Sequence, residues 1–257
     1  TDHWLSPLSI RAPANFDGIR VDNLTQSEAI DLIEKMIATR RHHRMVVVNA
    51  SKLVLAERDE RLRRVLQTSD LVTADGMSVA WASRFSRKFG GDLVDRVTGI
   101  DTFTDLCQRA AERGWRVYLL GAAPGVAEKA AVSLQTRFPN LIITGCSHGF
   151  FPEPESPVVA ATIASTQADV LFVAMGSPKQ EFWMAEFGPL TQTAFCLGVG
   201  GSFDHVAGNI KRAPRWMQRA GLEWFHRFAL EPRRLWRRYL IGNFQFLLYL
   251  LRLLQAR

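Results

Sequence analysis

The chain has 257 residues, of which 47% are hydrophobic, and it carries a formal net charge of +7. This length is enough for one large domain, or for one domain with an appendage, around a sizeable core. Residues 1–18 lack the apolar stretch of a secretory signal, and no run approaches the roughly 20 apolar residues of a spanning helix, so we expect neither. The widely spaced Cys107, Cys146 and Cys196 lack CxxC spacing, which favours free thiols in a reducing compartment.

The positive charge is concentrated at the C-terminal end. Residues 211–257 contain eleven Lys and Arg against two acids, whereas the rest of the chain contains 21 basic and 23 acidic residues. The same segment holds nine of the 26 aromatic residues. A basic, aromatic tail on a near-neutral body indicates a separate task for the tail. We therefore expect a loosely ordered N-terminus (1–15), an α/β domain (16–210) and a helical C-terminal appendage (211–257).

Strand-like and helix-like segments alternate along the body, starting with a capping box at Thr25–Glu28 that opens a helix. This alternation predicts a Rossmann-like, mostly parallel sheet with helices on both faces. The expected strands are 18–22, 45–48, 71–74, 115–120, 141–144, 170–175 and 193–197. The expected helices are 25–37, 51–56, 62–66, one from 77, one from about 101 to 113 with Gly114 at its end, 126–137, 158–166 and one from about 180.

Asp75 is the leading candidate for a functional side chain. It follows the short buried strand Leu71–Ala74, stands beside Gly76 and precedes a helix that begins at Met77. Open α/β sheets bind ligands at the carboxyl ends of their strands, and the glycine allows close approach to the backbone. A carboxylate there can accept a proton or a hydrogen bond. The alternative is that Asp75 only caps the following helix.

Other predicted strand ends carry glycine and polar residues suited to phosphate binding through free backbone N–H groups. The sequence lacks GxGxxG, GxxxxGK[ST], GxSxG and Asp-x-Asp motifs, so basic side chains would have to replace a metal on any diphosphate. The alternative for each arginine is a solvated surface charge. The strand-end groups are Asn49–Ser51, Gly121–Gly125, Gly176–Gln180 and Gly198–Asp204, and the basic candidates are Arg96, Lys179, Arg227, Arg234 and Arg237.

An ordered set of motifs resembles the WecG/TagA/CpsF glycosyltransferases over about residues 16–240. Each motif alone is weak, whereas the whole set in this order is specific. The motifs are Asn49-Ala-Ser-Lys-Leu53, Ala74-Asp-Gly-Met77, Arg96-Val-Thr-Gly99, Gly176-Ser-Pro-Lys-Gln-Glu181, Gly198-Val-Gly-Gly-Ser-Phe-Asp204, Lys211-Arg-Ala-Pro-Arg-Trp-Met-Gln218 and Gly221-Leu-Glu-Trp224.

The resemblance implies an inverting transfer of a sugar from a UDP-sugar to a polyprenyl-diphosphate-linked sugar, in bacterial surface-polymer or exopolysaccharide synthesis, without a cofactor or tightly held metal. It makes Asp75 the general base, with Asn49, Arg96 and Gln180 as the other active-site polar residues. The family often has Thr where this chain has Val47, so we expect UDP-glucose or a UDP-hexuronic acid in preference to UDP-N-acetylmannosamine. The expected substrate-binding residues are Gly76, Gly121, Pro124, Gly125, Gly176, Lys179, Gly198, Gly200, Asp204, Arg227, Arg234 and Arg237.

The tail suits a lipid-linked acceptor. Ile241–Leu251 is strongly apolar but too short to span a bilayer, which is typical of a helix lying in the interface. Basic residues near an anionic surface contribute about 1 kcal/mol each. We expect a peripheral protein on the cytoplasmic face of the bacterial inner membrane; alternatively, the tail packs on the body or on a second copy in a homo-oligomer. The residues assigned to the membrane are Arg233, Arg234, Arg237 and Arg238, and the aromatic Trp236, Tyr239, Phe244 and Tyr249.

Two other classes of protein remain as alternatives. The basic, aromatic tail would also suit a nucleic-acid-binding protein, but the polar residues at the strand ends would then have no task. A Rossmann-type dehydrogenase is disfavoured by the missing GxGxxG motif. We therefore expect no nucleic-acid partner.

Overall fold

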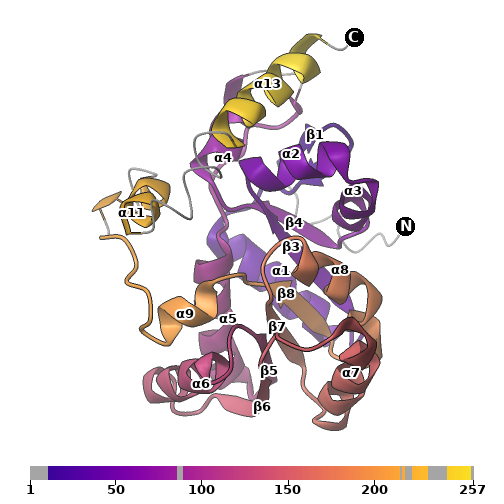
Figure 1. Ribbon diagram of the computed structural model, residues 1–257, viewed down its shortest axis with the longest axis vertical. Helices are drawn as coiled ribbons and strands as arrows, with labels where there is room; N and C mark the ends of the chain where they lie inside the picture. The colour runs from indigo at the N-terminus through magenta and orange to yellow at the C-terminus, as the bar shows by residue number, and fades with distance from the viewer. Residues whose placement is uncertain (1–10, 86–88, 215, 218–221, 231–241, 256–257) are drawn as a thin grey trace.

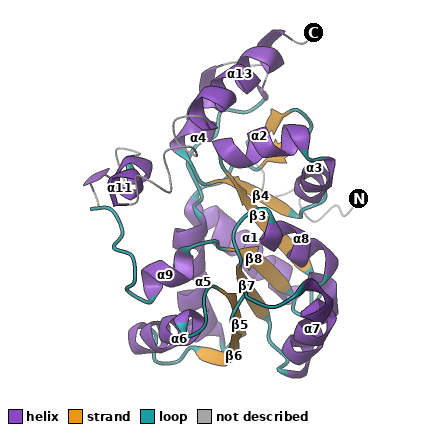
Figure 2. Ribbon diagram, in the orientation of Figure 1, coloured by secondary structure: helices purple, strands orange, loops and turns teal. Residues whose placement is uncertain are grey.

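The computed structural model describes residues 11–85, 89–214, 216–217, 222–230 and 242–255. A six-stranded parallel sheet in the order β4-β3-β8-β7-β5-β6 forms the centre of the molecule, with helices on either side (Figures 1 and 2). The predicted Rossmann-like α/β class is confirmed. The strands are β3 (His43–Val48), β4 (Leu71–Ala74), β5 (Arg116–Gly121), β6 (Ile142–Ser147), β7 (Val170–Ala174) and β8 (Phe195–Gly198).

Two hydrophobic cores, one on each face of the sheet, hold the helices. Alternate residues of β3 enter opposite cores. Val46 and Val48 belong to the first core, and Met45 and Val47 belong to the second. The first core contains residues from α2 (Ala50–Arg58), α3 (Glu60–Gln67), α4 (Met77–Phe85), α7 (Ser156–Ser165), α8 (Lys179–Glu186) and α13 (Gly242–Gln255). The second contains residues from α1 (Gln26–Ala38), α5 (Gly99–Arg113), α6 (Val126–Arg137) and α9 (Ser202–Val206).

Most helix boundaries follow from local signals. The predicted capping box at the start of α1 is present, because Thr25 and Glu28 bond each other's backbone N–H groups. Gly114 ends α5 in the left-handed conformation at φ 71°. The glycine-rich turn that we expected over 198–204 is shorter, because α9 already begins at Ser202. Two short 3₁₀ turns, Glu153–Glu155 and Gly188–Thr191, complete this part of the fold.

The prediction of a loose N-terminus is wrong for its last two residues, since β1 (Ala14–Phe16) begins at Ala14. It forms an antiparallel hairpin with β2 (Ile19–Val21) through a turn in which Asp17 and Gly18 both have positive φ. Phe16 is fully buried. Its ring stacks on the ring of Phe89, with 5.0 Å between the two ring centroids.

The C-terminal part combines α11 (Glu223–Leu230) with α13, which packs against α2. One stripe of α13 enters the first core through Phe246 and Tyr249. The assignment of Tyr249 to a membrane surface is therefore wrong, since it is only 2% exposed. In the described part of the chain, no helix combines the length and apolar character that crossing a membrane requires.

Candidate active site

The loops at the carboxyl ends of the strands meet at one edge of the sheet. Backbone hydrogen bonds join neighbouring strand ends: Asp75 N–H donates to Val48 O at 2.8 Å, and Ala122 N–H donates to Ala174 O at 2.7 Å. The connections from β5 and β7 leave in opposite directions, to β6 and β8. Open α/β sheets bind ligands outside the carboxyl ends of their strands, often at such a divergence, which here lies between β5 and β7. The structure therefore gathers the polar turns that are scattered along the sequence.

Asp75 lies half-buried directly after β4. Within the described residues its carboxylate makes no hydrogen bond or ion pair, and it accepts none from the first turn of α4. The capping alternative is therefore not supported. A half-buried carboxylate without an internal partner is available to take a proton from a ligand.

Asn49 lies at the end of the neighbouring strand β3 and caps α2. Its Oδ1 accepts a hydrogen bond from the Lys52 backbone N–H at 3.0 Å. The cap fixes the orientation of the side chain. Its amide NH₂ group has no partner among the described residues, so it is left to donate toward the same edge as Asp75.

Gln180 has a different environment from the one we predicted. It is 4% exposed, its Oε1 accepts from Gly200 N–H at 3.1 Å, and its Nε2 donates to Glu181 Oε1 at 3.0 Å. A Cβ atom on Gly198 would lie 2.6 Å from Nε2, so a larger residue there would displace the Gln180 amide. Gln180 thus holds the glycine turn after β8 to the start of α8, which makes it a positioning residue in this structure.

Lys52 and Glu181 form a buried ion pair behind Gln180, and residue patterns in the sequence did not reveal it. Lys52 Nζ lies 2.7 Å from Glu181 Oε1 and donates to Val47 O at 2.6 Å. The two residues are 6% and 0% exposed, and Glu181 Oε2 has no hydrogen-bond partner in the described structure. Both belong to quoted motifs, but buried lysine and glutamate look like surface charges in a sequence.

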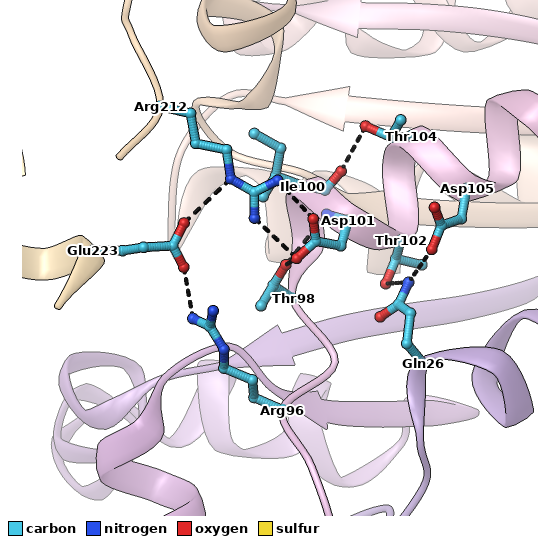
Figure 3. A network of polar contacts seen from close by, with 10 residues as sticks. All are labelled: Gln26, Arg96, Thr98, Ile100, Asp101, Thr102, Thr104, Asp105, Arg212 and Glu223. Carbon is cyan, nitrogen blue, oxygen red and sulfur yellow. Dashed lines mark hydrogen bonds and ion pairs between the residues drawn. The ribbon is translucent and has the colours of Figure 1, made fainter. Parts of the chain in front are cut away.

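Arg96 is held by an acid from the C-terminal part. Its Nη1 donates to Glu223 Oε2 at 2.6 Å, and Glu223 Oε1 accepts from Arg212 Nε at 3.2 Å. Arg212 also makes a bidentate contact with Asp101 at 2.6 and 2.9 Å (Figure 3). We predicted that Arg96 faces a diphosphate. In this structure its guanidinium group is already paired with the Glu223 carboxylate. Among the four, sequence analysis had singled out only Arg96.

The electrostatics of Asp101 follow from these contacts. Partial burial acts to raise the pKa of Asp101, but the hydrogen bonds from Arg212 and Thr98 outweigh it and leave the pKa below its ordinary value. For Arg212, burial acts to lower the pKa, and the hydrogen bond and charge of Asp101 raise it above its ordinary value. Both groups are therefore charged at neutral pH.

Several predicted glycines shape the same edge. Gly121 has φ 134°, and a Cβ atom on it would lie 2.5 Å from the backbone of Ala174, so only glycine fits between β5 and β7. Gly149, which we did not predict, packs in the same way against the Gly121 Cα. Exposed Pro124 and Gly125 stand at the start of α6, and Gly176 and Gly200 are in the left-handed region, whereas Gly76 is not.

Two further residues that we predicted to bind substrate already form hydrogen bonds within the protein. Lys179 Nζ donates to Gly149 O at 3.0 Å and lies 5.3 Å from the centre of the Phe151 ring. Asp204 Oδ1 accepts from Asn209 Nδ2 at 3.1 Å and stabilises the turn after α9. Both remain at the carboxyl edge, but their first role in this structure is to hold loops.

The tail arginines stay predictions. Arg227 belongs to α11, but its side chain lies outside the described residues, as do Arg234 and Arg237 and the other tail residues assigned to a membrane between 233 and 239. Among the residues that the structure describes, no group of three or more His, Cys, Asp and Glu is placed to hold a metal ion. Val47 is 6% exposed and lies beside Gly99, so any effect on the donor acts through packing.

The fold is that of a Rossmann-like α/β protein, and its candidate site lies at the carboxyl ends of the strands, where open α/β sheets bind ligands. The sequence profile of the glycosyl transferase WecG/TagA/CpsF family matches residues 14–257. The chain therefore belongs to this family and is a glycosyltransferase of cell-surface polymer synthesis. The family thus favours a transferase over the nucleic-acid-binding and dehydrogenase alternatives.

Proposed function

We propose that this glycosyltransferase moves a sugar from a UDP-sugar to a polyprenyl-diphosphate-linked sugar, with inversion at the anomeric carbon and without a metal. The observation that carries the proposal is Asp75, a carboxylate at the carboxyl edge with no partner among the described residues. Its position is the one expected of a general base that acts on a ligand bound over the strand ends.

The reaction is a single displacement. Asp75 takes the proton of the acceptor hydroxyl while that oxygen forms a bond to the anomeric carbon. The bond from this carbon to the diphosphate oxygen breaks on the opposite face, and UDP leaves with the electron pair. Asn49, fixed by its cap, donates from its NH₂ group to a sugar oxygen. Gln180 acts indirectly, by fixing the Gly200 backbone.

The direct test is UDP release by the purified protein with a synthetic lipid-diphosphate-sugar acceptor. General-base catalysis contributes about 10²- to 10⁴-fold, so Asp75→Asn should lose about that factor in kcat and keep the melting temperature. The matched control is Asp92→Asn, since that side chain is exposed and only its backbone oxygen is used, by Asn23. Near-normal turnover of Asp75→Asn would overturn the proposal.

The donor is proposed to be UDP-glucose or a UDP-hexuronic acid. The support is Val47, which buries a methyl group where the family often carries a hydroxyl. The same UDP-release assay with a panel of donors distinguishes these sugars from UDP-N-acetylmannosamine. The highest kcat/KM with UDP-N-acetylmannosamine would contradict this choice.

We further propose that the C-terminal part binds an anionic membrane surface, on the cytoplasmic face of the bacterial inner membrane. The support is the second stripe of α13, which points away from the body: Phe244, Leu247 and Leu251 are 62%, 53% and 45% exposed. An amphipathic helix normally has a polar outer face. The α13 helix is apolar on both sides, and it belongs to the segment 211–257, which contains eleven basic residues and two acids. This combination suits a position in the membrane interface.

A further inference from the structure

Glu223 is bound as an anionic ligand would be. Its two carboxylate oxygens each accept from a different guanidinium group, Oε2 from Arg96 at 2.6 Å and Oε1 from Arg212 at 3.2 Å (Figure 3). Arginine pairs that each take one oxygen of a shared anion are a frequent arrangement in phosphate recognition. The side chains of Arg96 and Glu223 are only 16% and 22% exposed, so the contact is largely shielded from water.

This contact lies at the carboxyl edge, close to the proposed reaction. Val97, next to Arg96, accepts a hydrogen bond through its carbonyl from Thr73 Oγ1 at 3.0 Å. Thr73 is two residues before Asp75. A Cβ on Gly99 would lie 3.8 Å from Gly198 O and 4.0 Å from the Val199 Cα, so the same segment also lies beside the end of β8. Arg96 is therefore held between the strand ends that carry Asp75 and the glycine turn.

The charges of the cluster cancel while Glu223 is in place. Arg96 and Arg212 carry two positive charges, and Glu223 and Asp101 carry two negative ones. Asp101 is fixed by Thr98 Oγ1 at 2.7 Å and makes two bonds to Arg212 that do not involve Glu223. Among these four residues, removing the Glu223 carboxylate leaves one net positive charge, while Asp101 still provides a partner that orients Arg212.

We propose that Glu223 is a resident anion that occupies the position of a substrate phosphate and gives way to it. A diphosphate carries more charge than a carboxylate and displaces Glu223 from Arg96 and Arg212. When the nucleotide product leaves, the carboxylate returns to the two arginines. The identity of the diphosphate as UDP rests on the proposed function, but the anion site does not.

The proposal predicts an effect opposite in sign to that of a structural clamp. If Glu223 competes with the ligand, then its neutral analogue binds anions more tightly and releases UDP more slowly. If Glu223 only holds the two arginines in position, then the same change loosens them and weakens anion binding. The affinity of a simple anion therefore separates the two roles.

The experiment measures the Kd of inorganic pyrophosphate and of UDP by calorimetry on the full chain at low ionic strength. Glu223→Gln should bind both about threefold to tenfold more tightly than wild type, the effect of one partly shielded charge pair. The UDP product-inhibition constant should fall by the same factor. The matched control is Glu186→Gln, which removes one acid from an exposed pair with Arg61 and should change neither constant.

Unchanged or weaker pyrophosphate binding by a folded Glu223→Gln protein overturns the proposal. Should that variant fail to fold, Glu223→Asp keeps the charge but is too short to reach both arginines, and it should also tighten binding. If pyrophosphate binds more tightly to Glu223→Gln while UDP binds to no variant, the anion site stands and the UDP-sugar proposal fails. If wild type turns over UDP-sugar but Glu223→Gln binds as wild type does, only the role of Glu223 fails.

Discussion

At the scale of the residue, the polar side chains of the candidate site divide into those with groups left available for a ligand and those that hold other residues. Asp75 has no partner within the described structure, and Asn49 keeps its NH₂ group after capping α2. Gln180 uses its carbonyl oxygen and one donor inside the protein. Behind it, the Lys52–Glu181 pair fixes the donor side of Gln180. The candidate site is therefore backed by an ion pair that is itself buried.

The first prediction concerns this pair. Lys52→Met leaves the fully buried Glu181 carboxylate without its cation, and breaking a buried pair in this way typically costs about 3–5 kcal/mol. The free energy of unfolding, measured with urea, should fall by that amount. The double variant Lys52→Met/Glu181→Leu should recover most of the loss, because an apolar pair of similar volume has no desolvation penalty.

The matched control removes the positive charge of Arg64 from an exposed ion pair. Arg64 and Glu60 lie 4.0 Å apart with side chains 74% and 69% exposed, so Arg64→Met should change stability by no more than about 0.5 kcal/mol. Equal losses in Lys52→Met and Arg64→Met would show that burial does not strengthen the Lys52–Glu181 pair.

At the scale of the element, α13 has two apolar sides that differ in exposure. The inner side buries Phe246 and Tyr249 against the first core. The outer side exposes Phe244, Leu247 and Leu251. A tail that packs on the body and a tail that binds a membrane were alternatives for the sequence. In the structure the inner stripe packs on the body. The outer stripe stays exposed and is left for the proposed membrane contact.

The second prediction tests the outer stripe. In Leu247→Gln/Leu251→Gln, both substituted side chains lie on the exposed side, so the fold should be kept. Burial of a leucine contributes about 1.5 kcal/mol or more, so partitioning into anionic liposomes should weaken about tenfold or more in a sedimentation assay. The matched control, Val132→Gln/Val158→Gln, changes two side chains that are 66% and 67% exposed on α6 and α7 and should sediment as wild type does.

The same pair of variants distinguishes a membrane from a second copy of the chain. A homo-oligomer built on the outer stripe would appear as a concentration-dependent mass in light scattering, lost in Leu247→Gln/Leu251→Gln. Liposome binding equal to that of wild type, together with such a loss of mass, would assign the stripe to subunit contact and reject the membrane proposal.

At the scale of the whole molecule, the sequence predicted the parallel sheet and its flanking helices. Buried parallel strands are continuous apolar runs bounded by polar turns, which makes segments such as 45–48 and 170–174 easy to recognise. The strand 14–16 was missed because it is short and follows Pro13. The Asp17-Gly18 turn that pairs it with β2 is a local hairpin signal and could have revealed the strand.

Pairings between distant side chains could not be predicted. Arg96 and Glu223 are separated by 127 residues, and Asp101 and Arg212 by 111. No periodicity links such positions, and each arginine looks like a solvated charge until the chain has folded. The same holds for the inward side of α13: its apolar run suggested a lipid surface, and only packing shows that Tyr249 is covered by protein.

The last prediction asks whether the C-terminal part is a separate unit or a piece of the body. The predicted domain boundary at residue 211 implies that removing residues 211–257 leaves the α/β domain intact. The structure argues otherwise for α13, because Phe246 and Tyr249 are both nearly fully buried in the first core. Losing a large buried aromatic side chain costs about 3–5 kcal/mol. Deleting residues 242–257 should therefore lower the free energy of unfolding by several kcal/mol.

The measurement is urea unfolding of the truncated and full-length proteins followed by far-UV circular dichroism. The control is Leu247→Gln/Leu251→Gln, which keeps the inner stripe and should unfold within about 1 kcal/mol of wild type, as expected for exposed substitutions. A truncated protein as stable as the full chain would mean that α13 contributes nothing to the body. A destabilised truncation beside a stable double variant would show that α13 completes the core with its inner side, while its outer side contributes little to the stability of the body.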